Sequence, residues 1–292
     1  MLGFSVVIPA KNESATIGRL VSQILENTTC SEVIVVDDGS SDSTAEIALE
    51  AGARVLAHPY PKGNGAAIKT GARGASMDVL IFMDADGQHD PRDIPVLIEK
   101  IESGYDLVVG ARGAVSQASL GRRLANGFYN KLASYMTGHR VADLTSGFRA
   151  VRKDKFIEFL HLLPNGFSYP TTSTMAFFRA GYSVCYVPIL VHARKGESHI
   201  RPVQDGIRFL LIIFKIGTLY SPLKLFFPLA VSIFSTGLGY YIYTYLTASR
   251  FTNMSALMFT TALTIFMVGL VSEQITSLMY SGRTHSDSRR QK

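Results

Sequence analysis

The sequence predicts an α/β fold with a mostly parallel sheet, followed by an apolar helical hairpin. Short β-branched runs alternate with helix-like segments through about the first two hundred residues, as in parallel α/β domains. After Phe209 the sequence becomes predominantly apolar. The chain has 292 residues, of which 47% are hydrophobic and 18% are charged. That length suffices for one large domain and a smaller apolar part.

Short apolar runs in the first part predict the strands: Phe4–Ile8, Glu32–Val36, Arg54–Ala57, Val79–Met83, Asp106–Gly110, Phe148–Val151 and Ser183–Val187. Helices are expected between them, and Asn12 and Ser14 are expected to cap the first helix. The longer helices expected later are Leu120–Met136, Lys153–Leu163 and Thr171–Ala180. In such folds ligands bind at the carboxyl ends of the strands, where this sequence places its polar clusters.

The last third of the chain has the pattern of a membrane anchor. Val203–Tyr220 is amphipathic and is expected to lie on a membrane surface. Leu225–Leu246 and Met254–Tyr280 are each long enough to span a bilayer, which takes about 20 helical residues. A buried hairpin of a soluble protein is the alternative, but so long a charge-free run is rare in soluble cores.

These patterns divide the chain into four parts. We expect a globular domain over residues 1–200, an interfacial amphipathic helix over 201–222, two membrane-spanning helices over 223–281 and a basic tail over 282–292. Basic residues flank the hairpin, whereas its connection carries Arg250 alone. The positive-inside rule then places both termini in the cytoplasm. We expect an integral protein of the inner (plasma) membrane.

Two features of the hairpin leave its packing open. Glu273 is expected either near the interface or in a contact across an oligomer. Gly237 and Gly239 would allow close helix packing, so we consider a homo-oligomer.

Charge and cysteine content exclude other classes of function. The net charge is +6, but no basic stripe with interleaved aromatic residues is present, so nucleic acid is not expected as a partner. Cys30 and Cys185 have no metal-binding spacing and are expected to be reduced thiols.

The strongest chemical signal is the segment Asp84–Gln88, which follows an apolar strand. Carboxylates at positions i and i+2 can share one divalent cation such as Mg²⁺ or Mn²⁺, which also binds substrate phosphates. A polar turn is the alternative for this segment alone. Asp37–Asp42 ends another strand, and its acids could bind a ribose or base, or cap the next helix. Lys62–Gly65 precedes a helix in a manner that suits a phosphate, although it is not a Walker A sequence.

The motifs Val6–Glu13, Val35–Ser40 and Met83–His89, in this order and spacing, resemble the family 2 glycosyltransferases, which have the GT-A fold. Val109–Arg112 and Asp143–Arg149 resemble the polyprenyl-phosphate sugar synthases of that family, such as dolichol-phosphate mannose synthases and bacterial undecaprenyl-phosphate glycosyltransferases. The resemblance covers roughly the first two hundred residues, and the hairpin matches the bacterial branch.

The resemblance implies a role for each matching residue. Together with Lys62, the residues expected around the nucleotide are Pro9, Ala10, Glu13, Asp38 and Asp84. Asp84, Asp86 and Gln88 are expected to hold the metal. Asp86, Arg112, Arg122 and Arg123 are expected to act in catalysis, the arginines on phosphates. Thr145, Ser146 and Arg201 are expected near the acceptor phosphate.

The resemblance also implies the reaction. We expect inverting, metal-dependent transfer of a sugar from a UDP- or GDP-linked donor to a polyprenyl phosphate, with undecaprenyl phosphate favoured. One alternative is a family 2 transferase that extends a glycan, although the chain has no tryptophan for the motif typical of such enzymes. The other is a catalytically silent membrane scaffold that binds a nucleotide sugar. A nucleotidyltransferase would have no evident use for the hairpin.

Overall fold

The structure, a computed structural model, describes residues 2–112, 120–166, 168–189, 191, 217–218 and 220–281. For residues 120–126, 280 and 281 it describes the backbone alone. The chain divides into a first unit, Met1–Ile200, and a second unit, Arg201–Lys292. The predicted interfacial helix lies largely outside the described residues, as does the basic tail.

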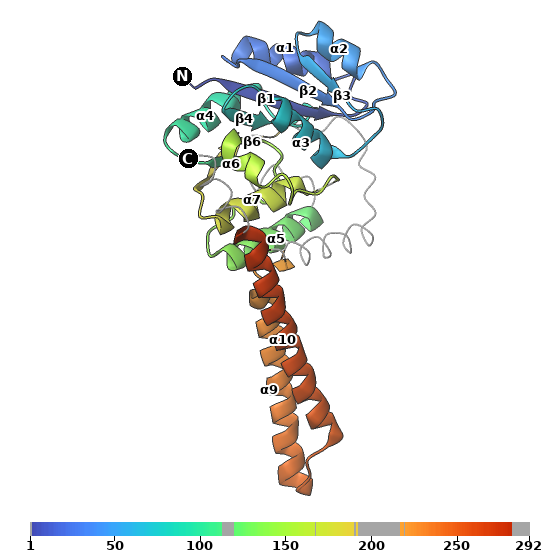
Figure 1. The fold of residues 1–292 in the computed structure, drawn as a ribbon, viewed down its shortest axis with the longest axis vertical. Coiled ribbons are helices and arrows are strands. Elements are labelled where there is room, and N and C mark those ends of the chain that lie inside the picture. The colour runs from blue at the N-terminus through green and yellow to red at the C-terminus, as the bar shows by residue number, and fades with distance from the viewer. Residues whose placement is uncertain are drawn as a thin grey trace, which may run out of the picture. The chain divides into compact units, whose positions relative to one another are not determined.

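The first unit is built on a seven-stranded sheet in the order β3-β2-β1-β4-β6-β5-β7 (Figure 1). Its strands are β1 (Phe4–Ala10), β2 (Glu32–Asp37), β3 (Arg54–Ala57), β4 (Val79–Phe82), β5 (Leu107–Arg112), β6 (Arg149–Arg152) and β7 (Val184–Ile189). All neighbouring pairs are parallel except those of β6, which is antiparallel to β4 and β5. The predicted, mostly parallel sheet is confirmed.

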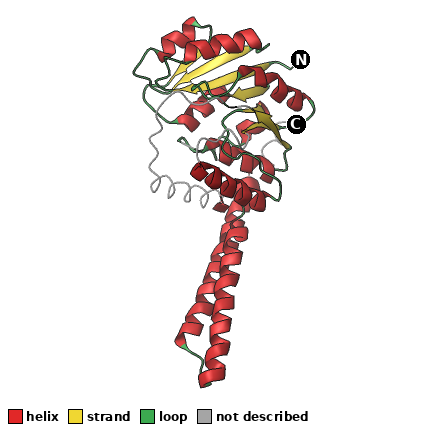
Figure 2. Cartoon of the chain, turned by 180° about the vertical axis from the view of Figure 1, so that it is seen from behind, coloured by secondary structure: helices red, strands yellow, loops and turns green. Residues whose placement is uncertain are grey.

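Helices cover both faces of this sheet (Figure 2). They are α1 (Ile17–Asn27), α2 (Thr44–Glu50), α3 (Asn64–Gly74), the short 3₁₀ turn η1 (Pro91–Asp93), α4 (Ile94–Glu102), α5 (Leu120–Thr137), α6 (Lys153–Glu158) and α7 (Tyr169–Arg179). On one face α1 and α4 pack on alternate strand residues such as Val6, Val35 and Ile81. On the other face α3 approaches so closely that Gly71 lies against Val7. These layers leave the carboxyl edge of the sheet open to loops.

Two local expectations were wrong. Asn12 does not cap the first helix, because α1 begins only at Ile17 and Asn12 adopts a left-handed backbone with φ of 55°. The Asn12 side chain instead accepts a hydrogen bond from the Ser41 amide at 2.9 Å. The helix expected over Lys153–Leu163 ends at Glu158, where hydrogen bonds between residues three apart replace the α-helical pattern.

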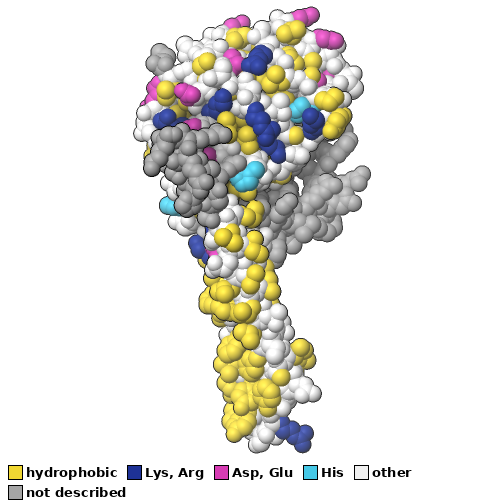
Figure 3. All heavy atoms as spheres, viewed as in Figure 1, with side chains coloured by type: hydrophobic (Ala, Val, Ile, Leu, Met, Phe, Trp, Pro, Cys, Tyr) yellow, Lys and Arg dark blue, Asp and Glu magenta, His cyan; other side chains and the backbone are white. Residues whose placement is uncertain are grey.

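The second unit is a hairpin of two long helices, α9 (Pro222–Ala248) and α10 (Asn253–Ser281). Both are long and apolar enough to cross a membrane, and only 11% and 17% of their most apolar windows are buried. Figure 3 shows hydrophobic side chains along most of the visible hairpin surface. A hairpin from the core of a soluble protein would be covered, so this surface requires an apolar environment.

The hairpin resolves where Glu273 lies. Its Oε2 accepts a hydrogen bond from the Leu223 amide at 3.2 Å, at the first turn of α9. Glu273 therefore sits level with the start of the hairpin and satisfies a helix N-terminus across it. Gly237 packs within the hairpin, because an added Cβ would lie 2.8 Å from Met258 Cβ, whereas Gly239 has nothing within 4 Å.

Candidate functional site

Polar side chains from several strands gather at the carboxyl edge of the sheet. β1 and β2 pair in register up to Ala10 and Asp37, so the loops that follow them lie side by side. β4 ends at Phe82, next to β1, and leads directly into Asp84. The sequence-predicted clusters therefore meet along one edge, as expected for a parallel sheet.

The loops after β1 and β2 are fastened to each other by hydrogen bonds. The Asn12 amide donates to Ser40 Oγ, and the Glu13 amide donates to Thr44 Oγ1, both at 2.9 Å. Asp42 accepts from the amides of Ser14 and Thr44, and the hydroxyl of Thr44 in particular lowers the pKa of Asp42 to about 2. Of the two roles considered for the acids of this segment, Asp42 has the one at the start of a helix, because it accepts from the amide of Thr44, the first residue of α2. Pro9, Ala10 and Glu13 border this fixed corner.

Asp38 holds a neighbouring loop in place. Its two carboxylate oxygens accept hydrogen bonds from the amides of Lys62 and Gly63, each at 2.8 Å. His58 Nδ1 lies 2.7 Å from Asp38 Oδ1, and His58 Nε2 lies 2.9 Å from the Thr70 hydroxyl. Burial alone would raise the pKa of Asp38, but His58 and the two amides outweigh it and lower this pKa. Sequence reasoning missed His58, which no motif marks.

The start of α3 is already covered by protein. The amides of Gly65 and Ala66 donate to the carbonyls of Gly166 and Asn165 at 3.1 and 2.8 Å. These two amides cannot serve the phosphate that the glycine-rich segment was expected to hold. The Lys62 ammonium lies 5.5 Å from the centroid of the Tyr60 ring, on the loop that Asp38 anchors.

Asp84 and Asp86 lie on the turn after β4. The Asp84 side chain is 38% exposed, and the backbone of Gly147 lies against its carboxylate. Asp86 Oδ1 accepts from the Gln88 amide at 3.1 Å. Among the described residues no three His, Cys, Asp or Glu side chains converge on one point. A pair of accessible carboxylates nevertheless suits Mg²⁺ or Mn²⁺, because these ions take their remaining ligands from water and substrate phosphates.

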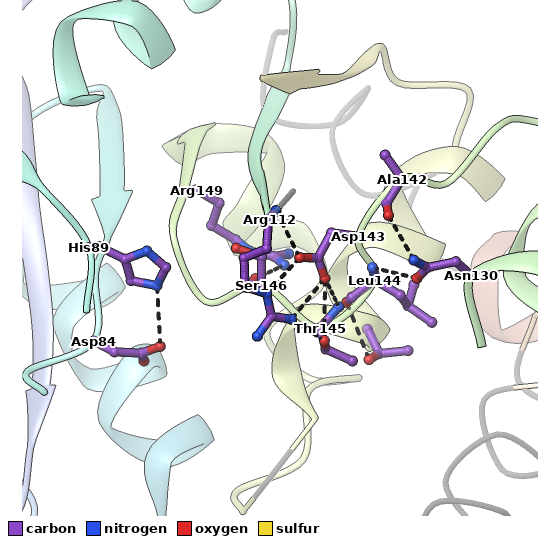
Figure 4. Close-up of polar contacts among 11 residues, drawn as sticks. Asp84, His89, Arg112, Asn130, Ala142, Asp143, Leu144, Thr145, Ser146 and Arg149 are labelled. Carbon is purple, nitrogen blue, oxygen red and sulfur yellow. Dashed lines mark hydrogen bonds and ion pairs between the residues drawn. The ribbon is translucent and has the colours of Figure 1, made fainter. Parts of the chain in front are cut away.

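His89 is a further member of the site that sequence reasoning did not single out. It is buried, stacks on Phe148 with ring centroids 5.1 Å apart, and places Nε2 4.0 Å from Asp84 Oδ2 (Figure 4). Its Nδ1 atom has no hydrogen-bond partner in the described part of the chain. Burial lowers the pKa of His89 to about 4, so the ring is uncharged at neutral pH.

Arg112 at the end of β5 is held by Asp143. The guanidinium donates from Nε and Nη2 to the two carboxylate oxygens at 2.7 and 3.0 Å, and Nη2 also reaches the Thr145 hydroxyl at 2.5 Å. Burial would raise the pKa of Asp143, but the bonds and charge of Arg112 lower it. With 27% of its side chain exposed, Arg112 presents an oriented cation near Asp84.

The segment from Asp143 to Arg149 is positioned by α5 and α7. Asn130 on α5 donates to the Ala142 carbonyl and accepts from the Leu144 amide (Figure 4). The Ser146 hydroxyl, expected near the acceptor, is buried and has no partner among the described residues. Arg149 is fully buried and pairs with Phe82 at the end of β4 and with Val109 in the middle of β5. It was not predicted as a site residue.

A cavity of about 720 Å³ adjoins Asp86 on the side of α1. Its lining includes Arg19, Gln23, His89 and Arg92. The structure therefore leaves open space beside the Asp86 carboxylate, whereas the Asp84 carboxylate faces Gly147. Three predicted site residues lie outside what the structure describes. They are Arg201 and, for their side chains, Arg122 and Arg123 on α5.

Two family models match the two parts of this chain. A family model described as Glycosyl transferase family 2 matches residues 5–160, and one described as GtrB C-terminal hairpin matches residues 221–278. A dolichyl-phosphate hexose transferase of Haloferax volcanii is 32% identical over 205 residues, covering 69% of this chain and 88% of that protein. An undecaprenyl-phosphate 4-deoxy-4-formamido-L-arabinose transferase of Photorhabdus laumondii is 38% identical over 161 residues, covering 51% of this chain and 49% of that protein.

Among solved structures, the fold is similar to that of glucosyl-3-phosphoglycerate synthase from Mycobacterium tuberculosis, in a complex with Mn²⁺, UDP and glucosyl-3-phosphoglycerate. The sequences are 26% identical, the TM-score is 0.58, and the match covers 73% of this chain and 80% of that chain.

Proposed function

The chain belongs to glycosyl transferase family 2 and is a glycosyltransferase, and we propose that it moves a sugar from a nucleotide sugar to a polyprenyl phosphate at a membrane. The observation that carries the proposal is the union of a family 2 domain with a GtrB-type hairpin in one chain. The hairpin brings the enzyme to lipid, and the relatives with matching sequence carry prenyl-phosphate transferase names.

We propose that the donor binds at the corner formed by Pro9, Ala10 and Glu13, with Lys62 on the loop that Asp38 holds. Asp84, Asp86 and Gln88 would hold Mg²⁺ or Mn²⁺ beside the diphosphate. When bound, such an ion neutralises the charge that develops on the departing nucleoside diphosphate. The related synthase, whose structure contains Mn²⁺ and UDP, supports a donor site that binds a nucleoside diphosphate with a divalent metal.

The acceptor phosphate would bind near Arg112 and Thr145. Asp143 fixes the Arg112 guanidinium through two hydrogen bonds, so the cation is preorganised for an anion and loses little side-chain entropy on binding. Ser146, Arg122, Arg123 and Arg201 remain proposed partners of this phosphate. Undecaprenyl phosphate is the proposed acceptor, and the relative named an undecaprenyl-phosphate transferase supports this choice.

The reaction we propose is a single in-line displacement that inverts the anomeric centre. The acceptor oxygen attacks the anomeric carbon while the bond to the nucleoside diphosphate breaks. A phosphate is already anionic at neutral pH, so the attack needs no strong general base. The protein's own contribution is to align the two substrates and to place Arg112 near the negative charge of the acceptor.

We further propose that residues 1–200 form the cytoplasmic catalytic domain, that 201–222 lie at the interface, and that 223–281 cross the inner membrane with both termini inside. The distribution of basic residues around the hairpin supports this orientation.

The test is a transfer assay on the full chain in detergent. It would combine undecaprenyl phosphate, Mg²⁺ or Mn²⁺ and a panel of radiolabelled UDP- and GDP-sugars, and would measure label in the organic phase. We expect label from one donor, abolished by omitting the acceptor or adding a chelator. Absence of label from every donor, with UDP or GDP binding intact, would contradict the proposed acceptor.

A further inference from the structure

Arg149 is a buried charge that has no carboxylate partner in the described part of the chain. It is 0% exposed, and no Asp or Glu oxygen of the described residues lies within 4.0 Å of its guanidinium. As the first residue of β6 it pairs with Phe82, the last residue of β4, two positions before Asp84. β6, which is antiparallel to both of its neighbours in the described sheet, thus places the backbone of this arginine beside the end of β4, from which the turn that carries Asp84 begins.

The hydrogen bonds of Arg149 connect α7 to one peptide of the site. Nη1 donates to the Pro170 carbonyl at 3.0 Å and to the hydroxyls of Ser173 and Thr174 at 2.8 and 3.2 Å. Nη2 donates to the Ser146 carbonyl, and Nε has no partner. Fold stability by itself does not favour such a residue, because an apolar side chain of similar volume avoids the cost of burying a charge.

The peptide that Arg149 holds supports the Asp84 carboxylate. The next carbonyl along the chain, that of Gly147, accepts from the Tyr169 hydroxyl at 3.0 Å. Gly147 also lies against Asp84, because a Cβ added to it would lie 2.5 Å from Oδ2 and 3.0 Å from Oδ1. Arg149 and Tyr169 therefore fix two successive carbonyls, those of Ser146 and Gly147, and the glycine between them lies against the Asp84 carboxylate.

We propose that Arg149 is a positioning residue for the metal-binding carboxylate Asp84, acting through the Ser146–Gly147 peptide. This inference rests on the proposed donor site, in which Asp84 binds a divalent cation next to the diphosphate. Arg149 does not touch the substrates. It fixes the position of the Ser146–Gly147 peptide, against which the Asp84 carboxylate lies, so Asp84 is oriented before the metal and the nucleotide bind.

The test compares Mn²⁺ binding by the full chain in detergent, measured by electron paramagnetic resonance titration with UDP present. Three substitutions disturb the support at different points: Arg149→Met removes the donors, Tyr169→Phe removes one bond to the peptide, and Gly147→Ala forces the carboxylate to move. We expect Arg149→Met and Gly147→Ala to weaken Mn²⁺ binding roughly tenfold or more, and Tyr169→Phe to weaken it less. UDP binding without metal should stay unchanged.

Arg152→Met is the matched control. Arg152 lies at the other end of β6, where it donates to the Ile101 carbonyl at 3.1 Å, so its loss should leave Mn²⁺ affinity unchanged. Melting curves identify any variant that fails to fold. If Arg149→Met fails to fold, the Mn²⁺ affinity of Gly147→Ala is the deciding measurement. This variant should fold, because its added methyl group meets the movable end of the Asp84 side chain.

The proposal would be overturned if folded Gly147→Ala bound Mn²⁺ with wild-type affinity. It would also be overturned if both Arg149→Met and Tyr169→Phe bound Mn²⁺ with wild-type affinity. So would a wild-type chain that binds no Mn²⁺ in the presence of UDP. A wild-type chain that binds Mn²⁺ with UDP but transfers no sugar to lipid would contradict the proposed acceptor alone, and the Arg149 comparison would still be decisive.

Discussion

Arg112 and Asp143, 31 residues apart in sequence, form an ion pair with two hydrogen bonds in which the carboxylate is 7% exposed. This pair joins the end of β5 to the loop before β6, and so ties the proposed acceptor cation to the segment that supports Asp84. Its geometry leads to the first two predictions.

Replacing Asp143 by Ala should destabilise the first unit by about 3 kcal/mol, because a partly buried Arg112 is left unpaired. The measurement is chemical unfolding of the detergent-solubilised chain, followed by circular dichroism. Adding Arg112→Met to Asp143→Ala should recover part of the loss. Strictly additive effects of the two substitutions would show that the pair is not coupled.

The stabilising effect of Asp143 should depend on pH. Its pKa is lower in the folded chain, so its contribution is fully present above the unfolded value of about 3.9 and is lost as pH falls through the folded pKa. The stability difference between wild type and Asp143→Asn should therefore be constant between about pH 5 and 7 and shrink below about pH 4. A difference that grows on acidification would contradict the assignment.

Asp86→Asn should reduce sugar transfer by roughly a hundredfold with Mg²⁺ or Mn²⁺ present, because it removes a carboxylate proposed to bind the metal. Asp78→Asn is the matched control, since Asp78 is exposed and precedes β4 at the opposite edge of the sheet. The measurement is label transferred to lipid. Near-normal turnover of Asp86→Asn would refute its metal role.

Gly237→Val should destabilise the hairpin by about 1–3 kcal/mol, because its side chain would overlap Met258. Gly239→Val should have little effect, as nothing lies within 4 Å of the added Cβ. Thermal unfolding of the full chain in detergent, monitored by circular dichroism, distinguishes the two. Equal loss in both variants would mean that the close approach at Gly237 is unimportant.

The proposed orientation predicts which thiols are accessible in intact cells. Ser249→Cys, in the connection between α9 and α10, should react with a membrane-impermeant maleimide added outside. Cys30 and Cys185 of the catalytic domain should react only after lysis. Protection of Ser249→Cys until lysis would reverse the topology.

Local sequence was sufficient for the features that depend on local chemistry. Short continuous apolar runs predicted the strands because buried parallel strands are rich in β-branched residues, and long charge-free runs predicted the hairpin. The segment Asp84–Gln88 could be recognised because both carboxylates lie on one turn after a strand.

Tertiary structure decided what depends on residues far apart in the chain. Asp38 anchors a loop through the amides of Lys62 and Gly63 and also bonds to His58, and Asn12 bonds to Ser41. Arg149 can support Asp84 only because β6 lies antiparallel between β4 and β5. No periodicity encodes such a partner, because the order of strands in a sheet is set by packing of the whole domain. The sequence by itself therefore determined the kind of chemistry at the carboxyl edge of the sheet. The fold determined which side chains hold the site residues in place, because those partners come from distant parts of the chain.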